Sequence, residues 1–189
     1  MTGVDRFYET RLLAPGEFDG HLAEGVSADL VFSRFNEIDL DLLAGLNAPH
    51  VLIDVDGTLT TRFSSKTEGI DEGTLQKLRQ IEEDPRFETV GLATENGGYP
   101  GDMLYTLGMS ATALVFQTWE AGKLGTSWKT TERFWRKILL ELDCFDEPEK
   151  VVTIGDSVVR DIATPQALGL RTVLVGKLNR QFRPRPLGY

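Results

Sequence analysis

The sequence of 189 residues contains a single cysteine, Cys144. One cysteine cannot form an internal disulfide, and it cannot build a metal site from several thiolates. The sequence also lacks an apolar run long enough to span a bilayer. Its first ten residues include acids, which is not typical of a secretory signal. These absences predict a cytoplasmic domain that folds without disulfides and has no membrane-spanning helix.

Basic residues are in the minority, because 20 Lys and Arg stand against 29 Asp and Glu, giving a formal net charge of −9. A chain this acidic is not expected to bind nucleic acid. Residues 162–189 differ from the rest, since they hold five basic residues and no acid. Two interpretations of this basic end stay open: a solvated tail, or a surface that contacts an anionic partner such as a phospholipid membrane.

Short β-branched runs alternate with helical patterns after residue 50, which is typical of an α/β protein. The runs predict strands at residues 50–55, 88–93, 113–117, 151–154 and 171–175. Apolar periodicity predicts helices at residues 72–83 and 131–142. The runs VLI and VVTI are continuously apolar, as parallel strands covered on both faces are. The predicted fold is therefore a doubly wound parallel sheet with helices on both faces.

Neither an internal repeat nor a low-complexity segment interrupts the chain. We expect one domain over residues 1–189, made of an N-terminal extension at 1–49, a core at 50–176 and a basic tail at 177–189. In such sheets, ligands bind outside the carboxyl ends of the strands. Residues just after each predicted strand are therefore the candidates for a functional site.

Two acids follow the first predicted strand. The run VLIDVDGTLT places Asp54 at the strand end and Asp56 two residues later, where both can point into one crevice. Such a pair can separate nucleophilic from general acid catalysis, with one carboxylate attacking phosphorus while the other carries a proton. Gly57 suits the sharp turn that follows, and Gly57 and Thr58 are candidate substrate-binding positions. The alternative is a strand that ends in an Asp-Gly turn with no catalytic role.

The second predicted strand ends in the run ATENGG. Its Thr94 hydroxyl can donate to a phosphoryl oxygen, and the glycines let backbone amides approach an anion. Glu95 and Asn96 are further candidates for substrate binding. The same run is also a good loop sequence, so the alternative here is a loop without a ligand.

The fourth predicted strand leads into GDSVVRD, which carries Asp156 and, five residues later, Asp161 on the opening turn of a helix. Asp156 and Asp54 are suited to bind a hard cation together. Magnesium prefers oxygen ligands and takes only one or two carboxylates while retaining water, so Mg²⁺ is the predicted cofactor. The alternative for Asp156 is a helix N-cap.

A lysine is needed to balance the phosphoryl oxygens and the crowded acids. Lys123 and Lys129 lie between the second and fourth strand ends. We favour Lys129, because it directly precedes the predicted amphipathic helix and is held near a strand end when that helix packs on the sheet. The alternative is an ordinary solvent-exposed lysine.

Taken in order, the DVDGT run, Thr94, Lys129 and the GDSVVRD run resemble the four motifs of the haloacid-dehalogenase (HAD) superfamily. The resemblance covers residues 50–176 and implies a Rossmann-like core in which Asp54 is the nucleophile and Asp56 the acid/base. Thr94 and Lys129 would complete the catalytic set. It also implies a bound Mg²⁺ ion, with metal-binding residues Asp54, Asp56, Asp156 and Asp161.

The N-terminal run FNEIDLDLLAGLNAPH and the run GDSVVRDIATPQALGLRTVLV are similar to the capless branch that includes phosphatidylglycerophosphate phosphatases. That branch usually has Asn at Gly57, Ser-Asn-Asn at residues 94–96, and Pro at Thr130. The resemblance implies a magnesium-dependent phosphomonoester hydrolase, with phosphatidylglycerophosphate as one candidate substrate. The alternative within enzymes is a soluble phosphatase of a small phosphoester or a phosphoprotein.

Sequence spacing predicts no cap domain, since only 39 residues separate Asp54 from Thr94 and 34 separate Thr94 from Lys129. An open site suits a large or membrane-borne phosphoester, or a site covered by a second subunit of an oligomer. Arg62 and Lys66 follow the first strand end and are candidate anion-binding residues. Two non-enzymatic alternatives are a phospho-receiver module, whose acidic pair lies on an earlier strand than its phosphorylated Asp, and a silent phosphate-binding scaffold.

Overall fold

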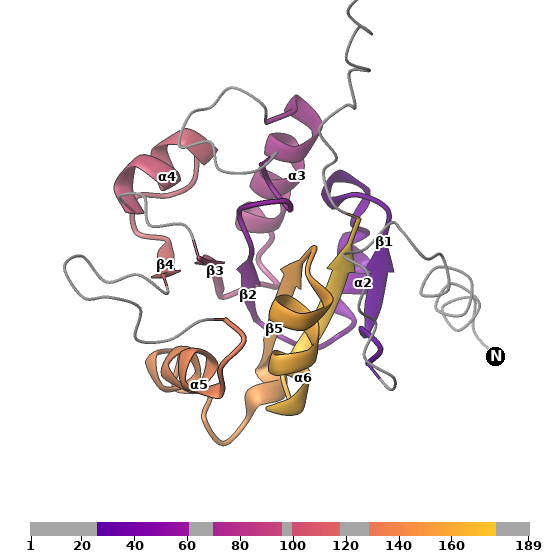
Figure 1. The fold of residues 1–189 in the computed structure, drawn as a ribbon. Helices are drawn as coiled ribbons and strands as arrows, with labels where there is room; N and C mark the ends of the chain where they lie inside the picture. The colour runs from indigo at the N-terminus through magenta and orange to yellow at the C-terminus, as the bar shows by residue number, and fades with distance from the viewer. Residues whose placement is uncertain (1–25, 61–69, 96–99, 118–128, 177–189) are drawn as a thin grey trace, which may run out of the picture.

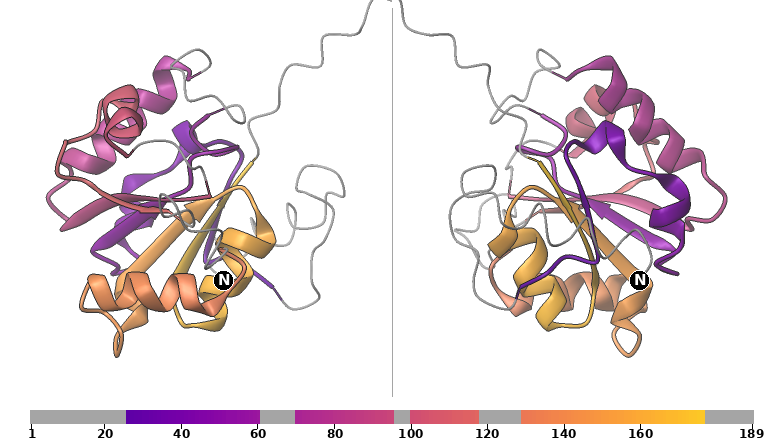
Figure 2. Two further views of the ribbon diagram at one scale, coloured as in Figure 1. Left: turned by 60° about the vertical axis from the view of Figure 1, so that its left-hand side comes forward. Right: turned by 90° about the vertical axis from the view of Figure 1, so that its right-hand side faces the viewer.

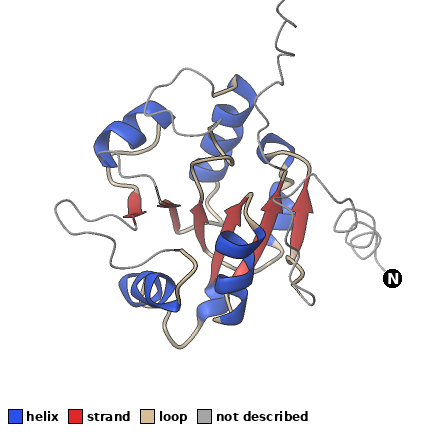
Figure 3. Cartoon of the chain, viewed as in Figure 1, coloured by secondary structure: helices blue, strands red, loops and turns tan. Residues whose placement is uncertain are grey.

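The computed structural model describes residues 26–60, 70–95, 100–117 and 129–176. Within these ranges six strands form one parallel sheet, in the order β1-β6-β5-β2-β3-β4 (Figure 1 and Figure 3). The strands are β1 Leu30–Phe32, β2 His50–Ile53, β3 Thr89–Thr94, β4 Leu114–Gln117, β5 Val151–Gly155 and β6 Arg171–Val175. The predicted α/β fold with a parallel sheet is confirmed.

Each of the five predicted strands is present, with ends that differ by at most two residues. The sixth, β1, lies in the segment that we expected to be an extension, and it pairs in parallel with β6 at the edge of the sheet. The prediction of five strands was therefore wrong by one. A strand of only three residues, LVF, is too short to show the periodicity from which strands are predicted.

Helices lie on both faces of the sheet (Figure 2). They are α2 Leu40–Ala44, α3 Glu72–Glu83, α4 Pro100–Leu107, α5 Glu132–Glu141 and α6 Thr164–Ala167, with 3-10 turns η1 Phe35–Glu37 and η2 Pro148–Lys150 and a π-helix, η3 Val158–Ala163. The predicted helix at residues 72–83 is confirmed, and Asp71 caps it by accepting from Thr74 N at 3.0 Å. The predicted helix at 131–142 is one residue shorter at each end, because Thr131 and Leu142 are its caps.

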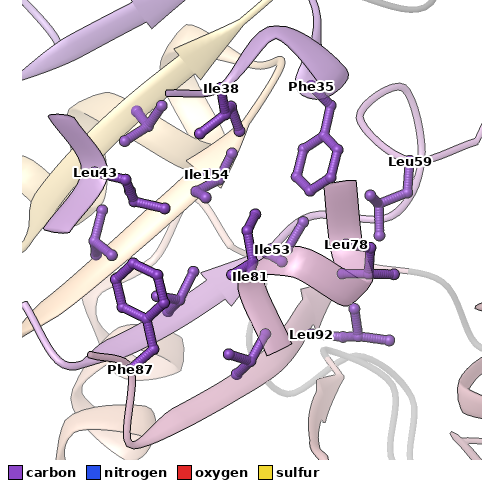
Figure 4. Close-up of a cluster of buried hydrophobic side chains, with 14 of the residues drawn as sticks. Phe35, Ile38, Leu43, Ile53, Leu59, Leu78, Ile81, Phe87, Leu92 and Ile154 are labelled. Atoms are coloured by element: carbon purple, nitrogen blue, oxygen red, sulfur yellow. The ribbon is translucent and has the colours of Figure 1, made fainter. Parts of the chain in front are cut away.

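The two faces bury separate apolar layers. Helices α2, α3 and α4 pack on one face, with Leu43, Leu78 and Ile81 against Ile53 and Ile154 of the central strands (Figure 4). Helix α5 covers the other face. Its buried side chains contact strand residues such as Leu52, which point to the opposite face from Ile53. Side chains alternate along β2, so this strand contributes apolar residues to both layers. A shift of one residue would exchange the two faces, and the burial of both therefore fixes the register of the strand.

All strands run in the same direction, so their carboxyl ends lie along one edge of the sheet. The chain leaves β2 toward β3 on one side, and β5 and β6 lie on the other side of β2. The boundary between β2 and β5 is therefore the point where the strand order reverses, and ligands bind at such points in open α/β sheets. None of the helices in the described ranges is long and apolar enough to cross a membrane.

Candidate active site

Asp54 follows β2 directly and is buried, with 6% of its surface exposed. Its backbone N–H donates to Ile154 O at 2.8 Å, which attaches it to β5 at the reversal point. Thr58 Oγ1 lies 3.4 Å from Asp54 Oδ2 as a donor. The intervening loop folds back tightly, since Gly57 N donates to Thr60 O at 2.8 Å.

Gly57 meets the two requirements that favour glycine in this loop. Its φ of +97° lies in the left-handed region, and a Cβ there would lie 2.5 Å from Asp156 Oδ2. The loop after β2 and the end of β5 therefore approach each other more closely than any side chain at residue 57 would allow. An asparagine at this position would not fit this geometry without movement of Asp156.

Lys129 brings a fully buried ammonium group to Asp54. Its Nζ donates to Asp54 Oδ1 at 2.7 Å and to Ala93 O at 2.9 Å, and it forms an ion pair with Asp161. These three partners match the three N–H groups of an ammonium. The predicted proximity of Lys129 to the Asp54 carboxylate is confirmed. Lys123, the other candidate, lies outside the described residues.

Asp156 and Asp161 approach Asp54 from the end of β5 and from the π-helix η3. The Asp161 carboxylate accepts from Ser157 N at 3.0 Å, so its two oxygens are divided between a backbone amide and Lys129. Ligand oxygens of Asp54, Asp156 and Asp161 all lie within 4.8 Å of one another. The structure thus gathers three of the residues predicted to bind metal.

This cluster has an excess of negative charge. Burial raises the pKa of Asp54 to about 7, although the Lys129 ammonium opposes the shift. Burial lowers the pKa of Lys129, but Asp161 and Asp54 together outweigh it and raise that pKa to about 12. One ammonium therefore faces three buried carboxylates. A divalent cation would compensate the remaining charge, and an all-oxygen donor set suits Mg²⁺.

The other predicted residues have different positions. Asp56 is half-buried, and its Oδ1 lies 3.5 Å from the Thr60 hydroxyl. Thr94 is fully buried at the end of β3. The Glu95 carboxylate forms an ion pair with Arg160 at 3.0 Å and accepts from Lys129 N at 3.2 Å. Three predicted residues lie outside the described ranges, namely Arg62, Lys66 and Asn96, and so does the tail at residues 177–189.

Two contributors to the site were not predicted, Arg160 and Trp135, and the close approach of Asp161 to Gly155 was not predicted either. Arg160 directly precedes Asp161, and an arginine beside a predicted metal ligand was a usable signal. Trp135 Nε1 donates to Lys129 O at 2.7 Å, a contact between residues six positions apart that helical periodicity does not indicate. Gly155 matters because the carboxyl group of Asp161 occupies the space that a Cβ would fill.

We expect the Gly155→Ala substitution to displace Asp161 and to destabilise the protein. The new methyl group would overlap the Asp161 carboxyl, and overpacking of a buried position typically costs about 1–3 kcal/mol. Urea unfolding of wild type and variant measures this loss. Gly45→Ala is the control, because Gly45, like Gly155, has no left-handed φ, and a Cβ there would come no closer than 3.2 Å to Asp41 O. Equal stability of Gly155→Ala and wild type would contradict the expected overlap.

The segment of the chain that supplies the later site residues is similar to a known protein family. Residues 129–181 match a family described as HAD-hydrolase-like. The matched segment includes Lys129, Asp156 and Asp161, whereas Asp54 lies before it. No curated protein matches the sequence.

Three solved structures are similar to this chain, and the one with a TM-score above 0.5 shares its fold. An uncharacterized protein from Listeria monocytogenes serotype 4b matches with a TM-score of 0.56 and 14% identity, over 72% of this chain and 85% of that one. The cobalt-bound deoxy-D-mannose-octulosonate 8-phosphate phosphatase from Haemophilus influenzae matches with a TM-score of 0.45 and 18% identity, over 70% of each chain. The 3-deoxy-D-manno-octulosonate 8-phosphate phosphatase from Yersinia pestis matches with a TM-score of 0.43 and 18% identity, over 70% of this chain and 65% of that one.

Proposed function

We propose that this protein is a HAD-type phosphatase that hydrolyses a phosphomonoester through an aspartyl-phosphate on Asp54. The observation that carries the proposal is the Asp54 carboxylate itself, which lies at the reversal point of the sheet with the Lys129 ammonium 2.7 Å away and two further carboxylates beside it. A nucleophile, a buried positive charge and a set of metal ligands therefore occupy one place. The family match at residues 129–181 supports the same reaction class.

The reaction proceeds in two displacements at phosphorus. An Asp54 oxygen forms a bond to phosphorus as the ester P–O bond breaks, and Asp56 gives its proton to the leaving alkoxide. Asp56, now a carboxylate, takes a proton from water as that water attacks the phosphorus of the aspartyl-phosphate. Inorganic phosphate leaves, and the Asp54 carboxylate and the protonated Asp56 are restored. Lys129 reduces the electrostatic cost of bringing a phosphate to Asp54.

Mg²⁺ is the proposed cofactor, held by Asp54, Asp156 and the backbone carbonyl of Asp56. When bound, it supplies the positive charge that offsets repulsion between these carboxylates and the phosphoryl oxygens. Asp161 is the proposed orienting residue, because one of its oxygens accepts from Ser157 N and the other pairs with Lys129. The donor chemistry of the cluster fits this ion.

The experiment that tests the proposed function combines a substrate panel with trapping of the intermediate. The panel contains an aryl phosphate, sugar phosphates, nucleotides, phosphopeptides and vesicles of phosphatidylglycerophosphate, each with Mg²⁺ and with a chelator. Acid quenching during turnover should leave a phosphoryl group on the peptide that contains Asp54. Absence of hydrolysis across the panel with Mg²⁺ would contradict the proposal. The lipid hypothesis stays a prediction, since its basic residues at 62, 66 and 177–189 lie outside the described ranges.

The charge excess at the site predicts a pH dependence of stability for the metal-free protein. The pKa of Asp54 rises from its ordinary value of 3.8 to about 7 on folding. The folded state thus binds more protons than the unfolded state between these pH values, and the stability that Asp54 contributes falls as the pH rises through this window. We expect the wild type to lose roughly 1–3 kcal/mol relative to Asp54→Asn between pH 4 and pH 8.

Urea unfolding of both proteins with a chelator, at several pH values, measures this difference, and titrating groups that do not interact with Asp54 cancel in the comparison. Saturating Mg²⁺ should remove most of the wild-type loss, because the ion favours the ionised carboxylates. A wild-type protein that gains stability relative to Asp54→Asn as the pH rises would have the opposite sign and would refute the prediction.

A further inference from the structure

The backbone of Lys129 is held by side chains. Lys129 lies in no helix or strand, and α5 begins only at Glu132. Its N–H donates to Glu95 Oε1 at 3.2 Å, and its C=O accepts from Trp135 Nε1 at 2.7 Å. The position from which the lysine reaches Asp54 is therefore fixed from one side by the end of β3 and from the other by α5.

Glu95 makes a second contact that ties this position to the metal-binding side of the site. Its other oxygen, Oε2, accepts from Arg160 Nη1 at 3.0 Å. Arg160 directly precedes Asp161, which pairs with the Lys129 ammonium. One carboxylate thus bridges the lysine backbone and the π-helix that carries Asp161. Both side chains of the pair are partly covered, with 23% of Glu95 and 36% of Arg160 exposed.

We propose that Glu95 is a positioning residue. By accepting a hydrogen bond from the Lys129 backbone amide, it sets the position of the Lys129 ammonium relative to the Asp54 carboxylate. The kinetic consequence of this inference rests on the proposed phosphatase function. Its structural consequence rests only on the hydrogen bond between Lys129 N and Glu95 Oε1. Lys129 has its three N–H groups directed at three fixed oxygens. A shift of its backbone therefore changes all three contacts together, and displacements of about 1 Å in a catalytic group can lower rates about 100-fold.

The two glutamate contacts can be separated by substitution. Glu95→Ala removes both, whereas Glu95→Gln keeps a carbonyl oxygen that can accept from Lys129 N. Arg160→Met removes only the contact to the guanidinium. Glu82→Ala is the matched control, because Glu82, in the last turn of α3, also accepts from a backbone amide, Ser110 N at 2.7 Å.

We expect the Lys129 amide to lose its protection from hydrogen exchange in Glu95→Ala and to keep it in Glu95→Gln, Arg160→Met and Glu82→Ala. With an aryl phosphate and Mg²⁺, kcat of Glu95→Ala should fall roughly 10- to 100-fold, while KM changes much less. Glu95→Gln should retain most of the wild-type kcat. Thermal unfolding of all four variants reports whether each remains folded.

Three outcomes would overturn the inference: unchanged exchange at Lys129 in Glu95→Ala, an equal fall in kcat in Arg160→Met and Glu95→Ala, or failure of Glu95→Gln to restore activity. A failure of the proposed function is distinguishable from these. In that case the wild type hydrolyses no phosphomonoester, yet the exchange pattern at Lys129 still reports whether Glu95 holds its backbone.

Discussion

Replacing Asp54 with asparagine is expected to abolish magnesium-dependent hydrolysis of an aryl phosphate, with kcat reduced roughly 10³-fold or more. The amide is nearly the same size as the carboxylate, but it cannot form the acyl-phosphate. Lys129 keeps its contacts to Ala93 O and Asp161 in the variant. The protein should therefore stay folded while turnover is lost.

Steady-state kinetics and acid quenching measure this prediction together, since the variant should also trap no phosphoryl group. Asp41→Asn is the matched control, because Asp41 is 91% exposed and pairs only with Arg86 among the described ion pairs. Its activity should equal that of the wild type. Turnover of Asp54→Asn at a rate comparable to wild type would assign the nucleophile to another group.

The second large effect is expected from Lys129→Met. The substitution removes the ammonium from a place where Asp54 and Asp161 are both buried, and the carboxylates are left without their compensating charge. Loss of one partner of a buried ion pair typically costs about 3–5 kcal/mol. Since the pKa of Lys129 is raised to about 12, the wild-type lysine is charged throughout the neutral range.

Chemical unfolding at pH 8 and pH 5 with a chelator measures this cost. The loss should be smaller at pH 5, where Asp54 can take up a proton. Lys137→Met serves as control, because Lys137 is a half-exposed lysine of α5 that pairs with Glu141 at 3.8 Å. A loss below about 1 kcal/mol at pH 8, similar to that of an exposed pair, would mean that Lys129 does not balance the cluster.

The central part of the fold could be predicted from the sequence because its strands are apolar on both faces. Runs such as VVTI leave no interpretation other than a buried segment, and β5 begins at the predicted residue. The edge formed by β1 could not be predicted, because β1 is defined by its partner rather than by its own three residues. The helix α4 was not predicted, because its eight residues start at Pro100, just after the sequence NGGY, and proline and glycine both disfavour a helix prediction.

The same contrast holds for the candidate site, where the positions of several residues could be predicted and the contacts between them could not. Asp54, Asp156 and Lys129 could be placed because each follows or precedes a recognisable element, and parallel strands bring their ends to one edge. The contacts that arrange them could not be foreseen. Glu95 was expected to bind substrate, yet its carboxylate holds a backbone amide and a guanidinium, a pairing that depends on residues 34 and 65 positions away.

The position of β1 has a consequence for how the protein is made on the ribosome. The Asp29 carboxylate accepts from Thr172 N at 2.8 Å across a sequence separation of 143 residues. Thus β1 cannot pair with β6 until residues 171–175 have been synthesised, and Asp54 N cannot bond to Ile154 O until β5 has been synthesised. Domains with such distant pairings fold slowly, and their unpaired strand edges are exposed to aggregation in the meantime. Nascent chains that end before β5 should therefore depend on chaperones.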